Sequence, residues 1–281
     1  MFKCEIISDD GRILKLEDSS GITVYEIEGL NPVKAEINVT RSMGWNGGKF
    51  ASSHVESRNL VIKMALLGNP EETRRTLYNF CSPSNHVKFH FIGDTKDVYI
   101  DGYVEDLNIA FFSMYQTAQL VILCPEPFWK DSMEQVIEMQ NVTASFQFPY
   151  VPNEPVELGT YSNITEILAV NDGDVDTGLT IRVTASSQVV NPIIYNKLTN
   201  EFIGITYTLE AGNVLEITTG FGRKDITLYI GNEAFTLFSK RLSGSTWLSL
   251  RKGDNLFQYN ADSGKEFMNV KLIYTPEYTG V

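Results

Sequence analysis

The sequence is short of the residues that most metal and redox sites use. Its 281 residues contain only three histidines and three cysteines. Cys81 and Cys124 stand among apolar residues and no CxxC spacing occurs, which predicts buried, reduced thiols. The histidines are too scattered for a convincing metal site. We therefore expect neither a metal ion nor another cofactor. The six residues are Cys4, Cys81, Cys124, His54, His86 and His90.

Long apolar runs and an excess of basic residues are also lacking. No run approaches the roughly 18 apolar residues of a membrane-spanning helix, and the first ten residues carry no cleavage signal. We therefore expect no membrane segment and synthesis in a reducing cytoplasm. The formal net charge of -12 disfavours a surface that wraps nucleic acid, because displacing counterions from phosphates needs excess Lys and Arg. An acidic wall past which DNA slides without binding remains compatible with this charge.

The motifs of common enzymes are missing as well. No GxSxG, HExxH or CxxC occurs, and no serine stands in a recognisable nucleophile context. Asp172, Asp174 and Asp176 lack the distal Glu and the set glycine of a calcium loop, so they predict a hairpin turn. A glycoside hydrolase would need two convergent carboxylates, which the sequence does not display. We expect a protein that is not an enzyme.

What the sequence does contain is organised around one apolar stretch, Leu120–Cys124. Five residues without a polar break predict a strand that is buried on both faces. Pro125 and Pro127 end it, since neither can donate a ladder hydrogen bond. This strand is expected to close a first domain, and its proline-rich exit to lead to a second. The predicted parts are residues 1–131 (first domain), 132–160 (linker or crossing segment) and 161–281 (second domain).

The first domain is expected to be mixed, with about nine short strands and one helix. Residues 33–39 alternate apolar and polar side chains, a period of two that predicts a strand with one buried face. The helix follows Asn69 as its cap, has Pro70 in its first turn, and places Leu77 on a buried stripe.

A glycine-rich segment, Met43–Phe50, interrupts this pattern. It predicts a mobile loop or the tip of a long hairpin, with Trp45 and Phe50 as large aromatic side chains. An exposed Trp45 would suit a contact surface, whereas a Trp45 that folds back onto its own domain would not. Trp45 and Phe50 are the candidate residues of an inter-subunit loop.

Beyond residue 160 the sequence predicts almost only strands. They recur every 8–12 residues or so with turn signals between them, which indicates a β-sandwich or jelly roll. Examples are Leu179–Ala185, Ile193–Asn196, Val214–Thr218, Ile226–Ile230 and Lys271–Tyr274. Aromatic residues in this part could stack on sugars, although aromatic side chains in strands more often belong to the core. They are Tyr195, Tyr207, Phe221, Phe257 and Tyr259.

Several segments, taken in order, resemble the distal tail protein (Dit) family of long-tailed bacteriophages of Gram-positive hosts. In the first part they are Arg58–Ile62, Glu71–Tyr78, Ile100–Val104 and Cys124–Trp129. In the second part they are Asn171–Asp174, Asn213–Thr219, Ser245–Leu250, Gly253–Asn255 and Tyr274–Val281. Each motif is mostly strand and turn chemistry, and their order along nearly the whole chain makes the resemblance.

The resemblance implies a virion protein of the tail tip. Members form hexameric rings through an N-terminal domain similar to the tail-tube building block, and carry a galectin-like or carbohydrate-module-like sandwich. Such a ring joins the major tail tube protein to a tail-associated lysin or hub protein, and receptor-binding proteins can dock on it. The alternative is an adhesin module whose sandwich binds host cell-wall glycans. Neither reading involves sequence-specific nucleic acid or a membrane.

Overall fold

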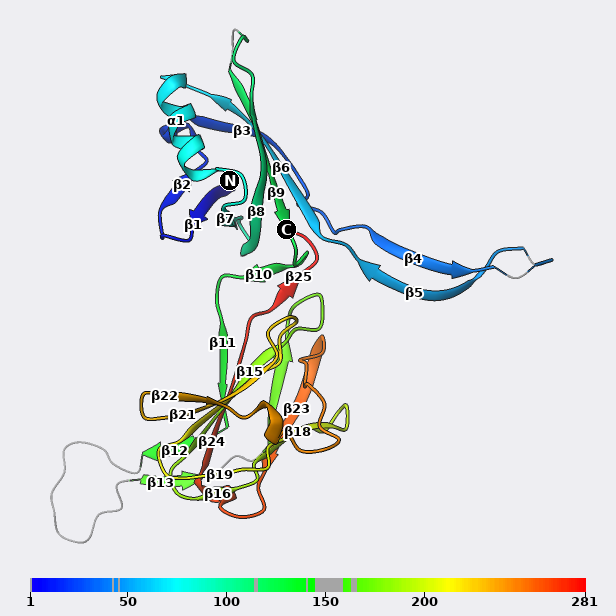
Figure 1. Cartoon of the computed structure of the whole chain (residues 1–281), viewed down its shortest axis with the longest axis vertical. Helices are drawn as coiled ribbons and strands as arrows, with labels where there is room; N and C mark the ends of the chain where they lie inside the picture. The colour runs from blue at the N-terminus through cyan, green and yellow to red at the C-terminus, as the bar shows by residue number, and fades with distance from the viewer. Residues whose placement is uncertain are drawn as a thin grey trace, which may run out of the picture. The chain divides into compact units, whose positions relative to one another are not determined.

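A computed structural model describes residues 2–41, 43–44, 46–113, 116–139, 141–144, 159–162 and 166–281. The chain divides into two compact units (Figure 1). The first comprises Met1–Ser132 together with Glu277–Val281, and the second comprises Met133–Pro276. Both units consist mainly of strands, with one α-helix in the described part. The expected mainly β fold is therefore confirmed.

The first unit is built on one nine-stranded sheet. Its strands follow the order β2-β1-β7-β8-β9-β6-β3, and β10 adds to β8 and pairs with β25. Their bounds are β1 Lys3–Ser8, β2 Ile13–Lys15, β3 Ile22–Glu28, β6 Arg58–Leu66, β7 His86–Ile92, β8 Asp97–Ile109, β9 Thr117–Cys124, β10 Trp129–Asp131 and β25 Glu277–Tyr278. A short 3-10 helix, η1 (Asp18–Ser20), precedes β3.

The apolar stretch predicted at Leu120–Cys124 lies in β9, between β8 and β6 in the middle of this sheet. Leu120, Ile122 and Cys124 are buried in the core, whereas Val121 and Leu123 are only half-buried. The expectation that both faces are fully buried is therefore wrong. A strand in the middle of a sheet can carry apolar residues on a face that is only partly covered.

The predicted helix is α1, Pro70–Phe80. Pro70 occupies the first helical position, Glu71 and Glu72 lie in the first turn, and Leu77 is fully buried. Asn69 stands at the N-cap but its side chain makes no capping hydrogen bond. The helix packs against β6 and so covers part of the sheet.

Strands β4 (Ala35–Thr40) and β5 (Lys49–Val55) form a hairpin that we call the arm. In the described part of the chain they pair only with each other, and Figure 1 draws them as a separate blue ribbon. Every residue of both strands is exposed. The alternation predicted for residues 33–39 does form a strand, but the buried face expected for it is wrong, because the arm has left the sheet that would cover it.

The second unit is a sandwich of a six-stranded and a four-stranded sheet. The larger has the order β11-β24-β15-β20-β21-β22 and the smaller β14-β23-β17-β18. Their bounds are β11 Gln135–Glu138, β14 Glu166–Asn171, β15 Leu179–Ala185, β17 Ile193–Asn196, β18 Glu201–Gly204, β20 Val214–Thr218, β21 Asp225–Ile230, β22 Glu233–Thr236, β23 Gly253–Asn260 and β24 Met268–Tyr274. Two strand pairs and two 3-10 helices complete the list of elements. They are the pairs β12 (Asn141–Ala144) with β13 (Gly159–Ser162) and β16 (Val189–Val190) with β19 (Thr208–Leu209), and the 3-10 helices η2 (Phe238–Lys240) and η3 (Lys265–Phe267).

The division of the chain differs from the predicted parts at two points. Residues 132–160 were expected as a linker, yet Gln135–Glu138 pairs with β24 in the large sheet. Residues 161–281 were expected to belong together, yet Glu277–Val281 lies in the first unit. Both segments are short strands whose partners are distant in sequence, so local patterns give no sign of their pairing. No helix in the described ranges is long and apolar enough to cross a membrane.

Candidate assembly surface

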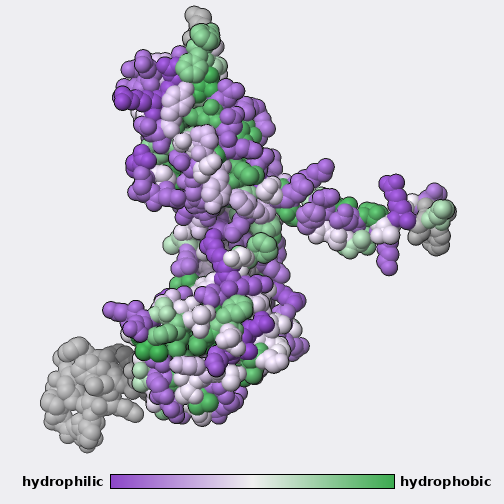
Figure 2. All heavy atoms as spheres, in the orientation of Figure 1, coloured by the Kyte–Doolittle hydropathy of each residue, from purple (hydrophilic) through white to green (hydrophobic). Residues whose placement is uncertain are grey.

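The arm has one apolar face and one polar face. Val39 lies opposite Phe50 in the register, and Ile37 lies two residues before Val39, so these three side chains share a face. Their exposed fractions are 61% for Ile37, 49% for Val39 and 61% for Phe50. On the other face, the Asn38 amide donates to the Ser52 hydroxyl at 3.2 Å. Figure 2 shows the apolar residues on the surface of the arm. An exposed apolar face on a regular hairpin is typical of a binding surface.

Of the two residues predicted for the inter-subunit loop, Phe50 lies in β5 on this apolar face. Trp45 falls outside the described residues, so both interpretations of that side chain remain predictions. The tip of the arm connects β4 to β5 through residues 41–48.

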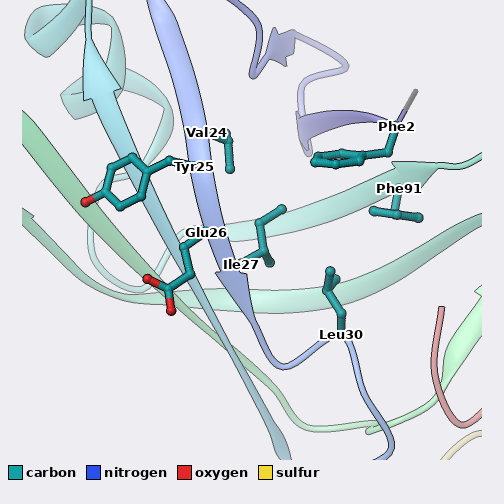
Figure 3. A pocket seen from close by; sticks show the side chains of 7 residues that line it. All are labelled: Phe2, Val24, Tyr25, Glu26, Ile27, Leu30 and Phe91. Carbon is teal, nitrogen blue, oxygen red and sulfur yellow. The ribbon is translucent and has the colours of Figure 1, made fainter.

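An apolar groove lies on the first unit where the two sides of its sheet approach each other (Figure 3). Val24, Ile27 and Leu30 come from β3 and the residues that follow it, and Phe2 and Phe91 come from the β1 and β7 side. The cavity volume is about 140 Å³. The rings of Phe2 and Phe91 stack with centroids 5.9 Å apart. The remaining lining residues are Tyr25 and Glu26.

Strand β3 leaves this groove open on one side. Among the described strands it pairs only with β6, and its register shifts between Val24 and Glu26, which marks a bulge at Tyr25. A bulged edge strand resists uncontrolled pairing with other chains while its side chains remain available. The groove is therefore a defined apolar surface beside a strand edge.

Arg58 lies beneath the surface of the same unit and is only 2% exposed. Its guanidinium donates to the carbonyl oxygens of Pro127 at 2.7 Å, Asn31 at 2.8 Å and Thr279 at 2.7 Å, and also to that of Gly29. Burial lowers the pKa of Arg58 from its usual value. The four carbonyl groups connect three chain segments that are far apart in sequence.

One of these segments is the end of the chain, which strand β25 anchors in the first unit. Trp129 and Lys130 of β10 pair with β25. The Tyr278 hydroxyl donates to the Asp131 carboxylate at 3.1 Å, and the Lys96 ammonium donates to the Gly280 carbonyl at 2.9 Å. We call these contacts of residues 277–281 with β10 and Lys96 the clasp, and no local pattern in the sequence had indicated it.

His90, Asp97 and Ser132 form a polar cluster that superficially resembles a hydrolase triad. The Nε2 atom of His90 lies 2.6 Å from Asp97 and 3.1 Å from the Ser132 hydroxyl. That hydroxyl donates to the same Asp97 oxygen, and these hydrogen bonds lower the pKa of the Asp97 carboxyl. A nucleophilic serine needs a base that is oriented from its other nitrogen. In this cluster the Asp97 carboxylate accepts the Ser132 proton in place of the imidazole. The hydrogen bonds therefore link β7, β8 and Ser132 to one another and do not activate a nucleophile.

The three cysteines are free and buried, which was predicted for Cys81 and Cys124. Burial raises the pKa of each thiol to about 12, so the reactive thiolate is scarce at neutral pH. None of them forms a redox or nucleophilic site in this arrangement.

The aromatic residues considered as sugar platforms mostly face inward. Phe257 and Tyr259 are fully buried in the core of the second unit, so that interpretation is wrong for both. Tyr207 is partly buried and packs on the same core, and Tyr195 contacts Phe202. Phe221, with 90% of its surface exposed, stands free of the core, and Tyr195 is half-buried on the face of β17 opposite buried Ile194. The core explains Tyr207, Phe257 and Tyr259, because strand aromatics fill the space between the two sheets.

Part of the chain matches the model of a known protein family. Residues 172–278 match the family model described as "Siphovirus-type tail component, C-terminal domain". No curated protein sequence matches the chain. The match lies almost wholly within the second unit, so this part of the chain is similar to the C-terminal domain of siphovirus-type tail components.

Solved structures extend the likeness over the whole chain. The SPP1 Dit (gp 19.1) protein, described as a paradigm of the hub adsorption apparatus in phages that infect Gram-positive hosts, shares the fold with a TM-score of 0.70. It has 14% sequence identity, and the match covers 98% of each chain. Chains of the phage P2 baseplate in its activated conformation with Ca and with Sr match over 100% of both chains, at TM-scores of 0.58 and 0.55 and identities of 11% and 10%. The resemblance to the Dit family is confirmed.

Proposed function

We propose that six copies of this chain form a ring at the virion tail tip. The ring joins the major tail tube protein to the tail-associated lysin or hub protein, and acts by assembly rather than by catalysis. The number six and these partners come from the family resemblance. The observation that carries the proposal is the arm, whose apolar face has no cover in the described part of its own chain.

The apolar groove of a neighbouring copy is the proposed acceptor for the arm. The arm and the groove are different patches of one chain, and contacts between unlike patches generate rings when the rotation closes. Ile37, Val39 and Phe50 offer aliphatic and aromatic side chains to a groove of the same character.

The acidic composition of the chain bears on the central channel of the proposed ring. A net charge of -12 per chain repels phosphate, which suits a channel through which DNA passes without binding. The second unit is proposed to face outward, where receptor-binding proteins can dock. Glycan binding by this unit is the alternative, and the burial of Phe257 and Tyr259 counts against it. The chain is proposed to be synthesised in the host cytoplasm.

The test compares solution masses by light scattering over a concentration series, with negative-stain images of the same samples. The wild type should reach the mass of six copies and show a central hole, either alone or with the tail tube protein as a template. A double variant, Ile37→Ser with Phe50→Ser, should remain monomeric, because it removes the apolar face without touching any buried residue.

Asn38→Ser is the matched control, since Asn38 lies on the polar face of the same strand. It should assemble like the wild type. Rings formed equally well by the double variant would remove the arm from the interface. A wild type that stays monomeric even with the tube protein present would contradict the ring itself, and specific glycan binding would then support the alternative.

A further inference from the structure

Three side chains capable of binding a metal ion meet at the base of the arm. Glu36 of β4 lies directly opposite His54 of β5, and Glu56 follows two residues after His54, just beyond the end of β5. The Nε2 atom of His54 lies 3.2 Å from a Glu36 carboxylate oxygen. One ligand atom from each of the three residues lies within 4.8 Å of the others. Glu36 and His54 occupy the polar face, opposite Ile37 and Val39.

These distances fit a single cation with little adjustment. Zn–N and Zn–O bonds are about 2.1 Å long, so two ligands at a tetrahedral angle are about 3.4 Å apart. The contact between His54 and Glu36 already has that spacing. All three side chains are exposed, so Glu56 can move toward the other two by a rotamer change without disturbing the core. Among the described residues no lysine or arginine pairs with either carboxylate, so no side-chain cation holds the central position.

We propose that Glu36, His54 and Glu56 bind a divalent transition-metal cation of the zinc type. One imidazole nitrogen with two carboxylates suits Zn²⁺ or Mn²⁺, whereas calcium sites use oxygen ligands alone. Three protein ligands leave at least one coordination position open for water or for a ligand from another molecule. The site does not depend on ring formation, because all three residues belong to one arm.

Such a site would stiffen the arm where it leaves the sheet. Glu36 lies near the start of β4, and Glu56 lies between β5 and β6, so a shared cation would tie both strands of the hairpin to the segment that enters the core sheet. A two-stranded hairpin has marginal stability by itself in water. A cation that binds only when β4 and β5 are paired therefore stabilises the ordered arm.

The test is calorimetric titration of the full-length chain with Zn²⁺ in a buffer free of chelators. The wild type should bind one equivalent. His54→Gln and Glu56→Gln should each weaken the affinity by at least about tenfold, because loss of a residue that only hydrogen-bonds to a metal ligand already has an effect of about that size. Zn²⁺ should also slow hydrogen exchange of the amides in residues 35–55 of the wild type and not in His54→Gln.

His86→Gln is the matched control. His86 also contacts one carboxylate, that of Asp9 at 2.6 Å, but among the residues that the structure describes it belongs to no group of three possible ligands. Its Zn²⁺ affinity should equal that of the wild type. The proposal is overturned if the wild type binds Zn²⁺ no more tightly than His54→Gln does, or if His86→Gln weakens binding by as much. Circular dichroism of each variant separates loss of a ligand from loss of the fold.

Discussion

Replacing Arg58 by methionine should destabilise the first unit more than any surface substitution. Methionine keeps an apolar stem of similar length, but it leaves the carbonyl oxygens of Gly29, Asn31, Pro127 and Thr279 without their donor. A hydrogen bond to a charged group contributes about 1.5–3 kcal/mol, but such contributions do not add within one network. Burying a guanidinium also has a desolvation cost. The methionine variant does not have this cost, so part of the loss is offset. We therefore expect a loss of about 3–5 kcal/mol, as for other broken buried charge networks.

This loss is a large share of the 5–15 kcal/mol that stabilises a typical domain. It can be measured by urea denaturation followed by tryptophan fluorescence. Trp129 is fully buried, and its ring lies 5.4 Å from the Arg58 guanidinium, so it reports on this unit. A background of Trp45→Phe and Trp247→Phe makes Trp129 the sole indole.

The control is Arg12→Met in the same background, since Arg12 belongs to the same unit as Trp129. Arg12 pairs with Asp10 at 2.6 Å, and its side chain is 52% exposed. An exposed ion pair contributes little to stability because solvent screens it, so the control should change the unfolding free energy little. If Arg58→Met shifts the unfolding free energy by no more than Arg12→Met, the carbonyl network does not hold the unit together and the reasoning is refuted.

Three further predictions concern the same unit. Deleting residues 277–281 should lower the urea midpoint of the Trp129 transition, since β10 loses one of its two partner strands; an unchanged midpoint would mean that the clasp is dispensable. Gly102→Ala should cost about 1–3 kcal/mol, because its methyl group would lie 2.6 Å from Ile122, and a thermal scan that shows no loss would contradict this overpacking. Ser132→Ala removes the main cause of the lowered Asp97 pKa. Its destabilisation should be full above the unfolded value of 3.8 and fade as pH falls through the folded pKa. If the unfolding free energy of Ser132→Ala differs from that of the wild type by the same amount at about pH 6 and at about pH 2.5, this linkage is contradicted.

Local patterns predicted the elements of the fold well. Pro70 at the first helical position and the buried stripe at Leu77 located the helix, and the strand Leu179–Ala185 has the predicted bounds. Period-two alternation correctly indicated a strand around Ile37. The alternation could not reveal that the apolar face of this strand is exposed in the chain. An alternating pattern indicates that one face is to be buried, but it does not indicate whether the same chain or another molecule buries it.

Long-range contacts were beyond the sequence analysis. The clasp of the chain end depends on Arg58 reaching the carbonyl of Thr279, two residues separated by most of the chain. The cluster at the arm's base was missed for a similar reason, since only the hairpin register brings Glu36 beside His54. A lone histidine gives no local signal of its cross-strand neighbours. The groove likewise arises from the curl of a sheet whose two sides are distant in the strand order.

The discontinuity of the first unit has a consequence for the order of events at the ribosome. Strand β25 follows the entire second unit in the sequence, although it pairs with β10 in the first. The second unit is therefore translated completely before the first can acquire its last strand. Until β25 has been translated, Arg58 lacks its acceptor at Thr279 and Trp129 lacks its backbone partner at Tyr278. A nascent subunit would thus complete its first unit only after its second unit has been synthesised, so the unit that begins first is finished last.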